Sequence, residues 1–255
     1  MGRLLKETPL SEIVATMEVL DRYGVNRDDL TCIRSNYQFA KDLAHFIRYG
    51  KQGTKSVHDR ACSIMGKNFF GVEEAIKRFG VNPTSQQLVA LSEIPFSETV
   101  LEQSKDTHVL VAVFPLSILE IRGKRGDTKL FYDKSSWYKK ETFAKKRDEA
   151  SWYLVCKTPA ENSFLKTWQE QQAFLAKDDE VPSARVMTYV IIGHYLATGE
   201  RLFKSVYVRT SSLDFYGYHV LLGLFDEDGL SFNQCCEYNR SDDIGLASAR
   251  KFPEL

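Results

Sequence analysis

The chain has 255 residues, of which 43% are hydrophobic and 27% charged, the proportions of a globular protein with a sizeable core. Its 34 Lys and Arg residues equal its 34 Asp and Glu residues, so no global attraction to nucleic acid or anionic membranes is expected, although a local patch is left open. The five cysteines are odd in number and form no CxxC pair, which argues against a disulfide scaffold or a zinc module. Because no apolar run could span a bilayer and the N-terminus lacks a signal-peptide core, we expect a cytoplasmic protein without membrane contact.

Helical periodicity dominates the first hundred residues. Apolar side chains recur every three to four positions over residues 11–23 and 28–49, and Gly24 is placed to end the first of these helices. The polar run at residues 50–55 is the best candidate for a linker. Shorter helices are predicted to follow, over residues 57–65, 72–79 and 85–91.

The last two of these short helices have the order of a helix-turn-helix. The second carries Gln86 and Gln87 but no Lys or Arg, the residues that would position such a motif on phosphates. An ordinary helical hairpin is therefore favoured, and nucleic acid is not an expected partner.

Strand and helix patterns mix in the remainder of the chain. Apolar and β-branched runs predict strands over residues 107–114, 151–157, 205–210, 219–225 and 245–252. Amphipathic helices are predicted over residues 164–176 and 183–198. Two helices followed by a compact antiparallel sheet indicate an α+β domain.

Three regions are therefore expected. Residues 1–50 form a helical N-terminal region, residues 51–104 contribute short helices, and residues 105–255 form the α+β domain.

The sequence contains no recognisable catalytic arrangement. None of the five histidines pairs with another at metal-ligand spacing, and no nucleophile elbow or phosphate-binding glycine loop is present. No catalytic residue, metal ligand or cofactor is expected as a result. Calcium at Asp226 or Asp228 is left open, although their sequence is first of all a tight turn. The adjacent Cys235 and Cys236 are interpreted as two free thiols.

Residues 205–250 have an unusual composition. They include no Lys, Met, Trp or Pro, whereas Tyr, Phe, Ser, Asn and Cys accumulate. Aromatic rings beside small polar groups on loops are typical of a binding surface. The alternation of Val220 and Leu222 with Leu221 predicts that the first two point inward and the third outward. The expected ligand-contacting residues are Asp214, Tyr216, Tyr218, Leu221, Leu224, Ser231, Asn233, Cys235, Cys236 and Tyr238.

The ending NRSDDIGLASAR, at residues 239–250, resembles the closing strand of the C-type-lectin-fold variable proteins of diversity-generating retroelements. Leu246 and Ala247 stand where that family usually has Phe and Arg. The resemblance covers residues 105–255 and implies a lectin-like fold of the formylglycine-generating-enzyme type. It also implies that a reverse transcriptase rewrites a variable region, here about residues 205–250, by errors at template adenines.

That mechanism implies a compositional rule. Asn codons mutated at adenines cannot become Lys, Met, Trp, Glu or Gln, and the absence of Lys, Met and Trp from residues 205–250 agrees with this. Gln234 and Glu237 do not follow the rule.

Three functions are compatible with these observations. The first is a display protein whose hypervariable C-terminal surface binds a variable ligand, which we expect to be a protein. The second is an enzyme related to the formylglycine-generating enzymes, which use cysteines and copper, and only Cys235 and Cys236 favour it. The third is a nucleic-acid-associated protein of a mobile element, built on the helical first third.

Overall fold

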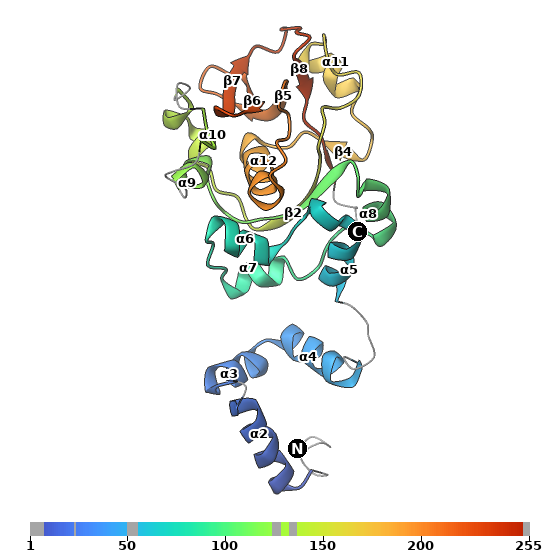
Figure 1. The fold of residues 1–255 in the computed structure, drawn as a ribbon, viewed down its shortest axis with the longest axis vertical. Coiled ribbons are helices and arrows are strands. Elements are labelled where there is room, and N and C mark those ends of the chain that lie inside the picture. The colour runs from blue at the N-terminus through green and yellow to red at the C-terminus, as the bar shows by residue number, and fades with distance from the viewer. Residues whose placement is uncertain (1–7, 23, 50–55, 124–128, 133–136, 252–255) are drawn as a thin grey trace. The chain divides into compact units, whose positions relative to one another are not determined.

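The computed structural model describes residues 8–22, 24–49, 56–123, 129–132 and 137–251. The chain divides into two compact units, residues 1–55 and residues 56–255 (Figure 1). The linker predicted at residues 50–55 lies outside the described residues.

The N-terminal unit is helical, as predicted. Its helices are α2 (Leu10–Arg22), α3 (Arg27–Ser35) and α4 (Tyr37–Tyr49). Gly24 follows the first with a left-handed backbone, φ +84°, as a glycine at a helix end does. The single helix predicted over residues 28–49 is interrupted because Asn36 is extended, and its side chain accepts a hydrogen bond from the Phe39 amide at 3.0 Å.

The second unit begins with short helices and two small connecting elements. These are α5 (Val57–Met65), η1 (Gly66–Asn68), β1 (Phe69–Phe70), α6 (Val72–Phe79), α7 (Ser85–Ala90) and α8 (Glu98–Ser104). The predicted helices at 57–65, 72–79 and 85–91 are confirmed to within one residue, whereas α8 was not predicted. Strand β1 pairs in parallel with β2 (His108–Val113), so these helices belong to the same unit as the C-terminal part.

The remaining elements complete an α+β fold. They are α9 (Ile118–Gly123), η2 (Trp137–Lys140), α10 (Thr142–Lys145), β3 (Ser151–Cys156), α11 (Trp168–Ala173), β4 (Asp179–Glu180), α12 (Ala184–Thr198), β5 (Tyr207–Leu213), β6 (His219–Asp226), β7 (Gly229–Cys235), β8 (Ile244–Leu246) and β9 (Ala249–Arg250). The helix predicted over 164–176 is shortened to α11, since Leu165 has φ +56° and cannot continue a helix.

The strands form two mixed sheets, and the prediction of one compact antiparallel sheet is wrong. One sheet has the order β1-β2-β3-β9-β4 and the other the order β7-β6-β5-β8. The strand predicted over 245–252 is split, because β8 pairs in parallel with β5 whereas β9 pairs with β3 and β4. The end of the chain therefore joins the two sheets.

Helix α12 lies between the sheets and forms the centre of the core (Figure 1). It packs against β2 of one sheet and against β5 and β6 of the other. Every residue from Ala184 to His194 is buried. Most of these residues are apolar, and the buried Arg185 pairs with the Asp148 carboxylate at 2.8 Å. A helix with apolar side chains on most of its circumference is stable only when surrounded by protein, and this explains its position. None of the described helices has the length and apolar character needed to cross a membrane.

Candidate binding surface

Two loops lie at the same end of the four-stranded sheet. The loop of residues 214–218 joins β5 to β6, and residues 236–239 follow β7. Strands β6 and β7 are antiparallel, with His219 opposite Cys235. The chain therefore enters β6 where it leaves β7, and the two loops are neighbours although 17 residues, 219–235, lie between Tyr218 and Cys236 in the sequence.

Asp214 organises the first loop. Its Oδ1 atom accepts hydrogen bonds from the Tyr216 and Tyr218 amides, both at 2.8 Å, and its own amide donates to the Tyr218 carbonyl at 2.9 Å. Gly217 has φ +81°, which only glycine adopts without strain. The Glu141 carboxylate accepts from the Phe215 amide at 2.9 Å. These bonds hold the backbone of a short loop and leave its aromatic side chains free to point outward.

Four aromatic side chains are exposed at this end of the sheet. Phe215 is 83% exposed, Tyr216 75% and Tyr238 77%, while Tyr218 is exposed to a lesser degree. The Phe215 and Tyr216 rings meet edge to face with their centres 5.3 Å apart. We refer to Phe215, Tyr216, Tyr218 and Tyr238 as the aromatic end. Exposed large apolar groups gathered in this way are typical of interaction sites.

The face of the sheet turned away from α12 is partly covered. Val220 and Leu222 belong to the main core, and Leu221 points to the opposite face, as the alternation predicted. There, however, Leu221 packs with Cys235 and Ile244 in a second cluster, flanked by Tyr207. Ser231 and Asn233 lie on this same face, because they oppose Gly223 and Leu221 in the β6–β7 pair.

The expectation that all ten candidate residues are accessible requires correction. Tyr216, Tyr218, Asn233, Cys236 and Tyr238 are exposed, and Leu224 and Ser231 are half-buried. Asp214, Leu221 and Cys235 are buried. The first of these is folded into its own loop, and the other two are covered by the second cluster.

A buried arginine explains the position of Cys235. The Arg209 guanidinium is fully buried and donates to the Cys235 Sγ atom from Nε at 3.2 Å and from Nη2 at 3.1 Å. It also donates to the Gln171 Oε1 atom at 2.9 Å and to the Asn239 carbonyl at 3.1 Å. Burial raises the pKa of the Cys235 thiol, although the Arg209 charge opposes this shift. A protonated, buried thiol is a poor nucleophile, so this arrangement positions the strand rather than performing chemistry.

Helix α11 packs against the end of the sheet at which the two loops lie. The Trp168 ring lies over His219 with centres 3.8 Å apart, and the Trp168 amide donates to the Glu237 carbonyl at 2.8 Å. Burial lowers the pKa of His219. The second loop is thus attached to α11, which limits its freedom to move.

The structure does not support a metal site at the acidic turn. Asp226 accepts from the Asp228 amide at 2.9 Å, as in an ordinary tight turn, and Asp228 lies 3.6 Å from the Lys129 Nζ atom. No group of three or more His, Cys, Asp or Glu residues in the described part of the chain is placed to hold a metal ion.

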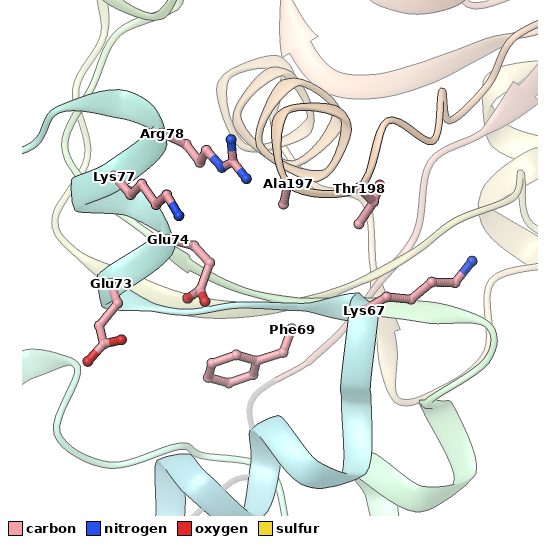
Figure 2. Close-up of a pocket in the computed structure, with 8 residues that line it drawn as sticks. All are labelled: Lys67, Phe69, Glu73, Glu74, Lys77, Arg78, Ala197 and Thr198. Atoms are coloured by element: carbon pink, nitrogen blue, oxygen red, sulfur yellow. The ribbon is translucent and has the colours of Figure 1, made fainter.

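A polar hollow of about 490 Å³ lies elsewhere, between α6 and the end of α12 (Figure 2). Glu74 is used for capping, since it accepts from the Gly71 amide at 2.8 Å, and Lys67 is paired with Glu200 at 2.9 Å. Both signs of charge face the hollow, so its lining selects no class of ligand. The lining residues are Lys67, Phe69, Glu73, Glu74, Lys77, Arg78, Ala197 and Thr198.

Comparisons of this chain with protein-family models, with curated proteins and with solved structures found no significant match.

Sequence reasoning missed two residues of this region. Phe215 is the most exposed of the four aromatic residues, and its place in the run DFYGYH was the available signal. Arg209 had no such signal, because its partners Gln171, Cys235 and Asn239 come from distant parts of the chain.

Replacing Asp214 by Ala is expected to loosen the loop. The substitution removes the acceptor of the Tyr216 and Tyr218 amides, and we expect the free energy of unfolding to fall by about 1–2 kcal/mol. Amide hydrogen exchange at these two positions should accelerate. Asp214→Asn is the matched control, since it keeps the Oδ1 acceptor. Unchanged exchange in Asp214→Ala would contradict the assigned role.

Proposed function

We propose that this chain is a cytoplasmic ligand-binding protein that displays a variable surface at the aromatic end of its four-stranded sheet. The observation that carries the proposal is the gathering of four exposed aromatic side chains on two hydrogen-bonded loops. Rigid rings bind with little loss of conformational entropy, and a held backbone reduces the cost further. Small polar groups at Ser231 and Asn233 continue the surface along β7.

Diversification by a retroelement and a C-type lectin-like fold are part of this proposal. The lack of Lys, Met and Trp in residues 205–250 supports the first. The return of β9 to the sheet that contains β2 and β3 supports the second. Within residues 205–250, buried and exposed positions alternate over short distances. A variable sequence in this segment must therefore keep the residues at the buried positions and change those at the exposed positions.

Natural variation of the gene tests the proposal. The coding segment for residues 205–250 should be sequenced across many natural copies, together with any nearby near-copy of it. We expect substitutions to concentrate at exposed positions such as Tyr216, Asn233, Cys236 and Tyr238, and at adenines of the near-copy. Buried positions such as Val220 and Phe225 serve as the internal control and should stay constant. Variation spread evenly over the gene would overturn the proposal.

A further inference from the structure

The charge of the variable segment differs from that of the whole chain. Residues 205–250 contain seven acidic residues and only three basic ones, whereas the full sequence is balanced at 34 each. The acidic residues are Asp214, Asp226, Glu227, Asp228, Glu237, Asp242 and Asp243. Asp226, Glu227 and Asp228 lie at the turn between β6 and β7, at the far end of β6, so the acids on the side of the aromatic end are Asp214, Glu237, Asp242 and Asp243. A local excess of acidic residues attracts partners of the opposite sign.

The three arginines of this segment are already engaged. Arg209 is fully buried, Arg240 pairs with Glu170 at 2.8 Å, and Arg250 pairs with Asp179 at 3.2 Å. They therefore do little to neutralise the surface.

The second loop carries acids that are not neutralised. Glu237 and Asp242 are exposed, and neither forms an ion pair within the described residues. The Glu237 carboxylate raises the pKa of the hydroxyl of Tyr238, its neighbour in the chain. A carboxylate thus stands directly beside an exposed aromatic ring.

The first loop adds one buried acidic side chain, Asp214. The Asp214 side chain is buried, and its Oδ2 atom has no hydrogen-bond partner within the described residues. Beyond Glu141, which contacts this loop, η2 carries Lys139 and Lys140. Glu237 and Asp242, exposed acids without an ion pair in the described residues, therefore lie in the loop that follows β7, away from these two lysines in the sequence.

We propose that the aromatic end binds a protein segment through its Lys or Arg side chains. A guanidinium or ammonium group would lie over an exposed tyrosine ring and beside the Glu237 carboxylate. Cations are attracted by the faces of aromatic rings and by carboxylates at the same time. The same charge disfavours nucleic acids, whose phosphates would meet acidic side chains. This inference rests on the proposed binding function and specifies its partner.

The test uses the full chain and two short peptides. An acetylated and amidated Gly-Arg-Arg-Arg-Gly peptide is titrated into the ¹⁵N-labelled protein, and the same peptide with citrulline in place of arginine is the neutral control. We expect saturable shifts of amides in residues 213–218 and 236–243 with the arginine peptide only. Raising the salt concentration should weaken the binding, since exposed charges are screened.

Paired variants locate the contact. Glu237→Gln and Tyr238→Leu should each weaken binding by about threefold, the fold-change of one exposed cation–aromatic or ionic contact. Glu227→Gln removes the same charge from the turn at the opposite end of β6 and should leave the affinity unchanged. The leucine variant keeps apolar area and loses the aromatic face.

Several results would overturn the inference. They are equal binding of the citrulline peptide, absence of binding by either peptide, shifts centred on residues 226–229, or shifts of the same amides by a short DNA duplex. If any of these results is obtained while natural variation is concentrated at exposed positions, the basic partner is rejected and the proposed binding function is retained. Evenly spread variation would reject the function itself.

Discussion

Replacing Phe232 by Ala will lower the free energy of unfolding by about 3–5 kcal/mol, the cost of deleting a buried aromatic side chain. Phe232 is buried, although it lies in the same segment as the exposed aromatic residues. Its ring stacks on Tyr138 with centres 4.0 Å apart and lies 6.1 Å from the Phe131 ring. Phe232 is therefore not one of the displayed aromatic residues of this segment. It faces the main core because it opposes Leu222 in the β6–β7 pair.

The matched variant replaces three exposed rings at once. Simultaneous substitution of Tyr216, Tyr218 and Tyr238 by Ser should cost within about 0.5 kcal/mol per site, since exposed positions contribute little to stability. Urea unfolding followed by circular dichroism measures both variants. Phe232→Leu, with a smaller expected loss of about 1 kcal/mol, keeps the comparison measurable if the alanine variant does not fold. A triple tyrosine variant less stable than Phe232→Ala would contradict the display of these rings.

Acidification between pH 6.5 and pH 4 will destabilise the protein through His108. This histidine lies in β2, where burial and the Arg250 charge lower its pKa to about 4. In the unfolded chain the pKa is about 6.5. Between these values the unfolded state binds a proton that the folded state does not. The stabilisation is therefore complete above pH 6.5 and is lost as the pH falls towards 4.

The expected loss from His108 is roughly 2–3 kcal/mol. Burial also lowers the pKa values of His194 and His219, so they act in the same direction. The measurement is the free energy of unfolding at several pH values for the wild type and for His108→Asn. The difference between the two should change over this range, because only the wild type carries His108, whereas His194 and His219 contribute to both proteins. An NMR titration of His108 with a midpoint near pH 6.5 would contradict the prediction.

Local pattern was sufficient for most helices and for the long strands. The residues of α5, α6 and α12 could be predicted from periodicity and capping, because helices depend on neighbours three and four positions apart. Strands β2, β3 and β6 could be predicted from their apolar runs, because this pattern also involves only residues that are close in the sequence. The exposed Tyr216 and Tyr218 were also recognisable, since the polar run around Gly217 is too short to bury them.

Pairing between distant segments was decided only by the tertiary structure. The chain divides between two sheets because β8 pairs with β5 whereas β9 pairs with β4. No local sequence pattern predicts the bend between β8 and β9. Strand β7 was missed because its Ser, Asn and Gln residues are typical of loops, and only its pairing with β6 makes it a strand. The amino-acid sequence by itself determined many of the helical and extended segments, and where aromatic and acidic residues accumulate. Only the tertiary structure decided that Phe232, Leu221 and Cys235 are buried although exposed residues lie nearby in the same segment. The reason is that burial depends on contacts between distant segments: Tyr138 stacks on Phe232, Arg209 binds Cys235, and Leu221 packs with Ile244.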